Sequence, residues 1–141
     1  MNINSPHKIL FISIPIFLAL SMINYKSRMD IQLLDIYAVM STLGVALFFS
    51  IYFVIIGSVY YFVKDIKLVL WATKIHIITT FFTAVLVIAL SLFFKEAMGL
   101  SNHAFRMTNQ FFYIIFLIFV LSQFLFLSNI LYSLFRIVKI K

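Results

Sequence analysis

The dominant feature of the sequence is a succession of four long apolar runs, which cover residues 9–25, 36–63, 75–94 and 111–135. A bilayer core about 30 Å thick is crossed by about 20 helical residues, so each run can form one transmembrane helix. The first run is the shortest and contains Pro15, and the second has no charged residue. Because lipid offers no partners to backbone groups, an all-α structure is predicted. We expect an integral membrane four-helix bundle that forms a single transmembrane domain over residues 1–141.

The composition excludes most other protein classes. Hydrophobic residues make up 65% of the chain and charged residues 11%, whereas soluble domains are about half apolar and about a quarter charged. The absence of cysteine excludes disulfides and thiolate chemistry. The first run also has features of a cleaved signal peptide, with Lys8 before it and Ala19 and Ser21 as a small-residue pair. Nothing after it is typical of a secreted domain, which favours a retained helix.

The basic residues predict the orientation of the helices. Lysine and arginine accumulate on the cytoplasmic side of membrane proteins. The N-terminal segment, the second loop and the C-terminal segment carry Lys8, Lys64, Lys67, Lys74, Arg136, Lys139 and Lys141. The first and third loops carry Lys26, Arg28, Lys95 and Arg106. This count of seven against four favours both termini in the cytoplasm, most simply in a bacterial inner membrane. Since the cations flank the apolar runs, they indicate topology and anionic lipid rather than a nucleic-acid partner.

Two loops have further features. The second, from Lys64 to about Lys74, alternates basic and apolar residues and contains Trp71. This pattern predicts a short helix on the inner membrane surface. The third loop, residues 95–110, is the longest polar segment on the outer side, and its histidine and arginine, His103 and Arg106, are candidate partner contacts.

Small and amide residues inside the spans are the candidate contact sites. Ser50 and Gly57 continue a stripe of small residues in the second span, and Gln123 and Asn129 lie in the fourth. Helices in lipid associate through small residues and interhelical hydrogen bonds. These residues are therefore interpreted first as contacts between the helices of this bundle. The functional alternative is that they bind a partner helix.

The sequence contains no evident catalytic or cofactor-binding constellation. Its four carboxylates, Asp30, Asp35, Asp65 and Glu96, all lie outside the middle of the spans. His7 and His76 are expected near the cytoplasmic edge and His103 outside, so the three cannot easily share a metal, and His7 with His76 is the only candidate pair for a bis-histidine haem. We therefore expect neither enzymatic activity nor a metal or cofactor, and we interpret His76 as an interfacial residue.

Three segments resemble immunity proteins of A-type pore-forming colicins. They are Tyr25-Lys26-Ser27 after the first span, Asp35-Ile36-Tyr37 at the start of the second, and Arg106-Met107-Thr108-Asn109 before the fourth. The basic tail from Arg136 to Lys141 also fits, although this chain is shorter in the first loop. The resemblance implies a basic four-helix inner-membrane protein that binds the membrane-inserted hairpin of a toxin before its pore opens.

A second resemblance is to the last four helices of haem-copper oxidase subunit I. The segment from Met29 to Val39 looks like that family's Leu-Asp-Ile-x-Leu-His-Asp-Thr-Tyr-x-Val loop, and Lys74-Ile75-His76 looks like a later Lys-Ile-His-Phe landmark. Gly57 to Phe62 and Gly99-Leu100-Ser101 lie near two further landmarks, so the match extends over nearly the whole chain. However, residues 41–44 stand where the family has its haem-binding histidines, and the loop histidine is Leu34. The resemblance implies a haem-less accessory or assembly subunit of a respiratory complex.

Together these patterns predict a non-catalytic small membrane protein, monomeric or weakly oligomeric. The first hypothesis is an immunity or exclusion protein that binds a membrane-inserting toxin or partner, with Ser50, Gly57, Gln123, Asn129, His103 and Arg106 as candidate contacts. The alternative is the haem-less respiratory subunit. A small transporter or channel fits less well, because no ionisable residue is expected at the bilayer midplane.

Overall fold

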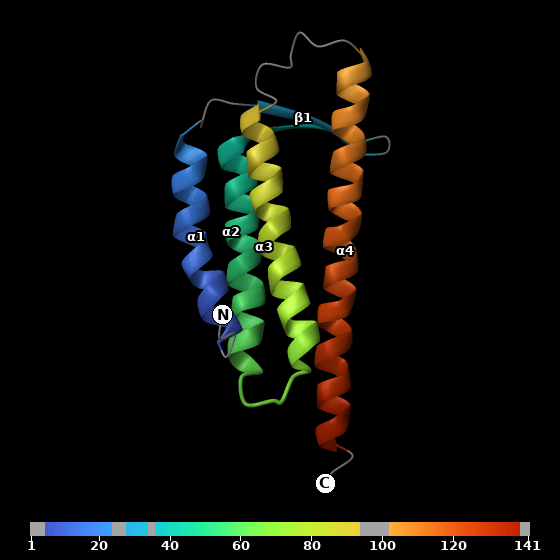
Figure 1. The fold of residues 1–141 in the computed structure, drawn as a ribbon. Helices are drawn as coiled ribbons and strands as arrows, with labels where there is room; N and C mark the ends of the chain where they lie inside the picture. The colour runs from blue at the N-terminus through green and yellow to red at the C-terminus, as the bar shows by residue number, and fades with distance from the viewer. Residues whose placement is uncertain (1–4, 24–27, 34–35, 94–101, 139–141) are drawn as a thin grey trace.

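The computed structural model describes residues 5–23, 28–33, 36–93 and 102–138, and in this part of the chain it has four helices and one β-hairpin (Figure 1). The elements are α1 Pro6–Met22, β1 Arg28–Leu33, β2 Ile36–Ser41, α2 Thr42–Phe62, α3 Leu70–Phe93 and α4 Asn102–Val138. Three helices are long and apolar enough to cross a membrane: α2, α3 over Leu70–Leu90 and α4 over Asn109–Arg136. The apolar α1 has 17 residues, near the lower limit for a span. The predicted membrane helical bundle is confirmed at this level.

The β-hairpin corrects the prediction that residues 36–63 form one helix. Strands β1 and β2 pair antiparallel, from Arg28 opposite Ser41 to Leu33 opposite Ile36. Helix α2 begins only at Thr42, where the Ser41 Oγ accepts a hydrogen bond of 3.0 Å from the Gly44 N–H. This bond is an N-cap, which satisfies one of the free amides at the start of a helix. Hydropathy does not detect the boundary, since strand and helix are equally apolar here.

The other boundaries also differ from the predicted spans. Helix α3 starts at Leu70 and contains Trp71, so the predicted surface helix over residues 64–74 is wrong. In its place, turns after α2 lead directly into α3. Helix α4 starts at Asn102, so part of the predicted 95–110 loop is helical. Helix α1 ends at Met22, before the predicted end of the first span.

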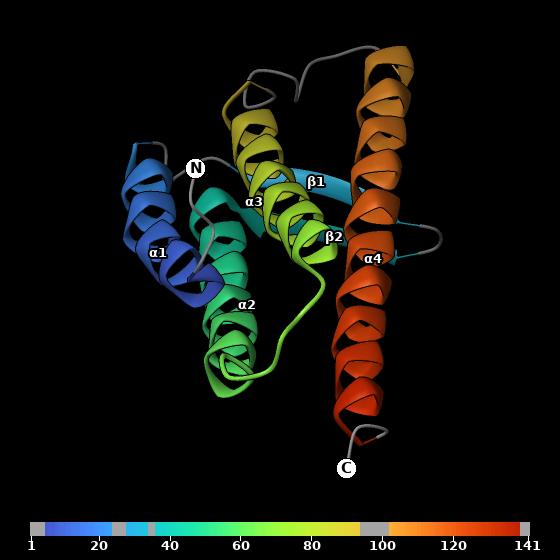
Figure 2. The same ribbon diagram turned by 60° about the horizontal axis from the view of Figure 1, so that its bottom comes forward.

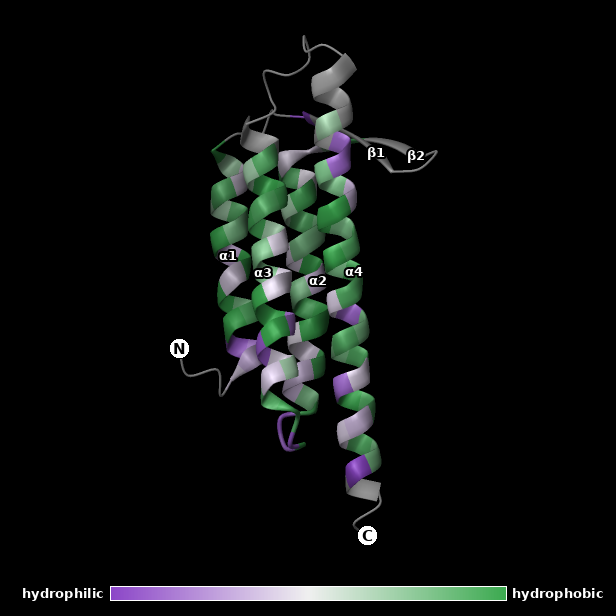
Figure 3. Ribbon diagram, turned by 45° about the vertical axis from the view of Figure 1, so that its right-hand side comes forward, coloured by the Kyte–Doolittle hydropathy of each residue, from purple (hydrophilic) through white to green (hydrophobic). Residues whose placement is uncertain are grey.

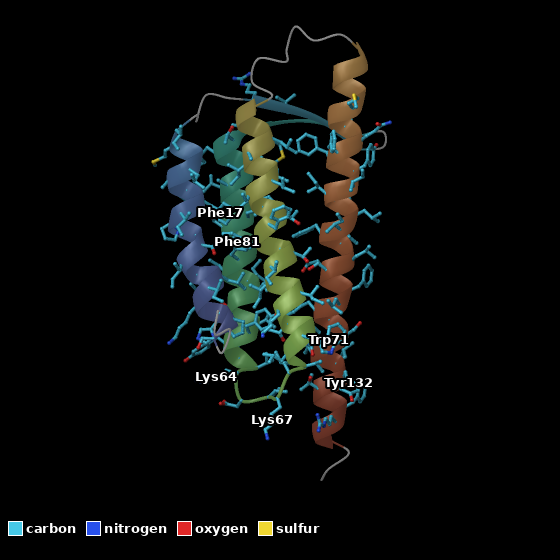
Figure 4. The ribbon with its side chains drawn as sticks, viewed as in Figure 1. Phe17, Lys64, Lys67, Trp71, Phe81 and Tyr132 are labelled. Atoms are coloured by element: carbon cyan, nitrogen blue, oxygen red, sulfur yellow. The ribbon has the colours of Figure 1, made fainter. Side chains whose placement is uncertain are left out.

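Helices α1 and α2 pack closely on each other, α3 lies against both of them, and α4 lies beside α3 at the edge of the bundle (Figures 1 and 2). Phe17 of α1 lies between Phe53 of α2 and Phe81 of α3, with ring centroids 5.3 and 5.5 Å apart (Figure 4). Helix α4 packs mainly on α3 and reaches α2 through Phe119, which contacts Phe49. Its spanning window is 22% buried, against 44% for that of α2. Much of the apolar surface of α4 therefore faces outward (Figure 3).

Hydroxyl groups inside the helices are mostly paired with their own backbone. Ser13, Ser50 and Thr83 each donate a hydrogen bond of 2.7 Å to the carbonyl four residues earlier. Such bonds let small polar residues lie inside an apolar bundle without leaving a free donor in lipid. The small-residue stripe therefore allows close helix packing.

Gly57 marks the close approach of α1 to α2. A Cβ atom at this position would lie 2.9 Å from Cε1 of Phe11. We expect Gly57→Ala to change the free energy of unfolding by less than about 0.5 kcal/mol, because the better helix propensity of alanine offsets a small rotation of the ring. Gly57→Leu should destabilise the bundle by about 1–3 kcal/mol, because the larger side chain separates the helices. Unfolding titrations with sodium dodecyl sulfate in mixed micelles measure both changes. Phe11→Ala should restore stability to Gly57→Leu, and failure to do so would contradict this contact.

Candidate functional site

A chain of hydrogen bonds joins α2, α3 and α4 inside the bundle. The Tyr60 hydroxyl lies 2.9 Å from Nδ1 of His76, and Nε2 of the same ring lies 3.2 Å from Oε1 of Gln123. The Tyr52 hydroxyl donates to the same Gln123 oxygen. The Gln123 amide nitrogen donates to the Phe119 carbonyl at 3.1 Å. We call this set, Tyr52, Tyr60, His76 and Gln123, the polar network.

The network fixes the direction of each hydrogen bond. The Gln123 Oε1 can only accept, so Nε2 of His76 carries the proton and donates. In the neutral ring Nδ1 is then an acceptor, so Tyr60 donates to it. Each member thus finds a partner on another helix. The arrangement holds α4 against α2 and α3 where lipid could not supply hydrogen bonds.

His76 is the central residue of the network, and its position corrects the interpretation of it as an interfacial residue. Its side chain is 0% exposed. The ring stacks on Phe126 of α4 with centroids 4.6 Å apart and an interplanar angle of 18°. Both ring nitrogens are hydrogen-bonded, so neither is free to ligate a metal or haem. Among the described residues, no group of three or more histidine, cysteine, aspartate or glutamate side chains could hold a metal ion.

Asn129 forms a second polar contact, at the start of α3. Its Oδ1 accepts from the Val69 N–H at 2.9 Å, and its Nδ2 donates to the Val69 carbonyl at 3.3 Å and to Oγ1 of Thr73 at 3.0 Å. The side chain thus binds the backbone of the residue just before Leu70, the first residue of α3. It fixes the α2–α3 turn to α4.

The six predicted contact residues have different surroundings. The polar side chains of Gln123 and Asn129 are hydrogen-bonded within the bundle, as is Ser50, while Gly57 faces Phe11. His103 and Arg106 belong to the first turns of α4, and their side chains lie outside those the structure describes. Gln123 and Asn129 therefore connect α4 to other segments of this chain and Gly57 lies at the contact of α1 with α2, whereas the hydrogen bond of Ser50 stays within α2.

Sequence reasoning missed three members of the polar network: Tyr52, Tyr60 and His76. A histidine and two tyrosines within apolar runs are the available signal, because polar groups in lipid need partners. Their pairing across helices has no local sequence pattern, since Tyr52 and Gln123 are 71 residues apart.

Two cavities border this site. The first is an apolar groove of about 220 Å³ between α2 and α4, near the hairpin end, where residues of α3 and β2 complete its wall. Its walls include Phe48, Phe49, Phe112, Phe116 and Phe119. The second is a cavity of about 430 Å³ at the opposite end, where α1 begins and α2 turns into α3. The two cavities differ in chemistry, because the second is bordered by charged side chains.

The chain was also compared with known proteins. No protein-family model matches it, and neither the curated proteins nor the solved structures include a significant match.

Proposed function

We propose that this is a non-enzymatic, multi-pass protein of a bacterial inner membrane that protects the cell by binding the apolar hairpin of a membrane-inserting toxin. Both termini are assigned to the cytoplasm by the seven-to-four count of basic residues. The start of α1, the Lys64–Lys67 turn and the end of α4 lie at one end of the bundle, which agrees with this assignment (Figure 1). The groove between α2 and α4 is the observation that carries the proposal.

The groove favours an apolar protein segment as its occupant. Its lining is almost entirely aliphatic and aromatic, and its volume of about 220 Å³ is below the 300–1,000 Å³ typical of small-molecule pockets. Helices in lipid associate by close packing, since lipid tails are as apolar as leucine. A groove that receives protruding side chains supplies such packing. A toxin hairpin inserted in the same bilayer has suitable side chains.

The predicted contact residues take indirect roles in this proposal. Gln123 and Asn129 hold α4 at the spacing that forms the groove, through their hydrogen bonds to α2 and α3. Ser50 and Gly57 allow the packing of α2. His103 and Arg106, at the outer end of α4, are proposed to contact the toxin before insertion.

The test is a pair of matched double variants. Phe48 and Phe116 are exposed walls of the groove, on α2 and α4. Phe62 and Phe135 are also exposed phenylalanines on the same two helices, but they lie outside the groove. Bacteria that express the protein are challenged with a panel of purified pore-forming colicins, and survival is counted. We expect wild type and Phe62→Ala/Phe135→Ala to protect against at least one toxin, and Phe48→Ala/Phe116→Ala to lose at least tenfold in protection, about 1.4 kcal/mol of binding.

Two outcomes would overturn the proposal. One is the absence of protection against every toxin, combined with purification in fixed ratio with a respiratory complex, which would favour the accessory-subunit hypothesis. The other is equal loss of protection in both double variants. Membrane levels are compared by immunoblot, so that altered insertion is not mistaken for lost binding.

A further inference from the structure

The larger cavity lies at the lysine-rich end of the bundle. It is an open cavity of about 430 Å³ between the start of α1, the end of α2 and the start of α3. Its polar and charged lining residues are His7, Tyr60, Lys64, Asp65, Lys67 and Thr73. Lys64 and Lys67 lie at the bottom of the bundle in Figure 4. The cavity therefore opens where the apolar helices end.

The electrostatics of this cavity favour an anion. Two lysines outweigh the single carboxylate of Asp65. The Lys64 ammonium is held 4.7 Å from the centre of the Tyr61 ring, a cation–π contact that positions the charge beside the cavity. Helices α1 and α3 both begin here, and neither has an acidic residue in its first turn. Their positive dipole ends add to the field of the lysines.

His7 supplies a second, independent indication. Its Nδ1 atom is buried and has no hydrogen-bond partner among the described residues. The ring is fixed edge-on to Tyr61, with centroids 5.6 Å apart. A buried ring nitrogen without a partner is unfavourable, and a neutral imidazole can carry its N–H on either ring nitrogen and so donate to an acceptor. His7 therefore places a ring with one unpaired nitrogen in the same cavity wall as the two lysines.

We propose that this cavity binds the phosphate of an anionic lipid headgroup. A lipid headgroup and a soluble phosphate ester present the same phosphate group. The position of the cavity at the end of the apolar helices favours the lipid. Ile66, Leu68 and Leu70 form an apolar part of the wall. Trp71, in the first turn of α3, is 61% exposed and has the amphipathic ring that membrane–water interfaces favour. Basic pockets between helices on the cytoplasmic side bind anionic headgroups in this way.

Trp71 is the only tryptophan of the chain and therefore an intrinsic probe of nearby lipid. The full-length protein is placed in phosphatidylcholine nanodiscs, and Trp71 fluorescence is measured as a quencher-labelled lipid is added in increasing fractions. The labelled lipid is either phosphatidylglycerol or phosphatidylcholine, and in both the quencher lies near the start of the acyl chain. We expect phosphatidylglycerol to bind near Trp71 at least fivefold more strongly than phosphatidylcholine. Lys64→Gln/Lys67→Gln should remove this preference, since each cation near a membrane surface contributes about fivefold. Asp65→Asn should strengthen it.

The matched control is Lys8→Gln/Arg136→Gln. It removes two exposed charges at the same end of the bundle that do not line the cavity. The proposal requires that this control keep the lipid preference. Equal loss in both double variants, or no preference in wild type, would overturn it, because general surface attraction would then be sufficient. If millimolar inorganic phosphate abolishes the preference at constant ionic strength, the site instead takes a soluble phosphate ester and the lipid assignment is wrong.

Discussion

Replacing Gln123 with leucine should lower the free energy of unfolding by about 1–2 kcal/mol. The variant removes the Gln123 Oε1, which accepts hydrogen bonds from both Tyr52 and His76. The Tyr52 hydroxyl and the His76 Nε2–H then lose their acceptor inside the bundle. A single interhelical hydrogen bond in a membrane protein contributes about 0.6 kcal/mol on average, whereas a buried orphan donor in a soluble protein costs about 1–3 kcal/mol. The expected effect therefore falls between these limits.

The measurement is an unfolding titration with sodium dodecyl sulfate, followed by circular dichroism. Gln110→Leu is the matched control, because Gln110 is an exposed glutamine of the same helix. We expect it to change stability by less than about 0.5 kcal/mol. A double-mutant cycle with Tyr52→Phe isolates one hydrogen bond and should give a coupling of about 0.6 kcal/mol. Additive effects in this cycle, or equal effects of the two leucine variants, would contradict the network.

Asn129→Leu should loosen the start of α3 by about 1–2 kcal/mol. The leucine leaves the Val69 N–H without its acceptor, although the Val69 carbonyl keeps the Thr73 amide and hydroxyl as donors. The loss is local, because the Tyr60, His76 and Gln123 contacts do not include Asn129. Amide hydrogen exchange at residues 69–73 should become about tenfold faster, since 1.4 kcal/mol corresponds to a factor of ten.

Ser133→Ala is the control for this prediction. Ser133 is buried one turn after Asn129 on α4, and its hydroxyl has no hydrogen-bond partner in the described residues. Its removal should leave exchange at residues 69–73 unchanged and should not lower stability, because no bond is broken. Acceleration of exchange throughout α3 by Asn129→Leu would show that the residue supports the whole helix rather than its first turn.

The hydropathy pattern predicts the bundle because backbone N–H and C=O groups in lipid must form hydrogen bonds within the chain. A long apolar run satisfies this requirement as a helix. It also predicted that Gln123 and Asn129 need partners. The start of α2 was not found, since residues 36–41 are as apolar as the helix that follows them. Serine is a common N-cap residue, so Ser41 could have indicated the start of α2. Because it lies inside one uncharged apolar run, the hydropathy pattern does not distinguish it from the residues around it. The lysines that flank Trp71 predict that it lies at the membrane interface. A surface helix and the first turn of α3 both satisfy this depth, so the sequence does not distinguish them.

The sequence by itself therefore determined the membrane class, the approximate helices and the end of the bundle that is richest in lysine. These properties depend on the hydropathy, charge and length of runs of consecutive residues, which can be read directly from the sequence. Only the tertiary structure decided that His76 is buried between Tyr60 and Gln123, that Asn129 binds the Val69 backbone, and that a charged cavity forms beside His7. These contacts join residues that lie far apart in the sequence, and no local pattern specifies which faces meet. They follow from side-chain packing and from the need to pair each buried polar group.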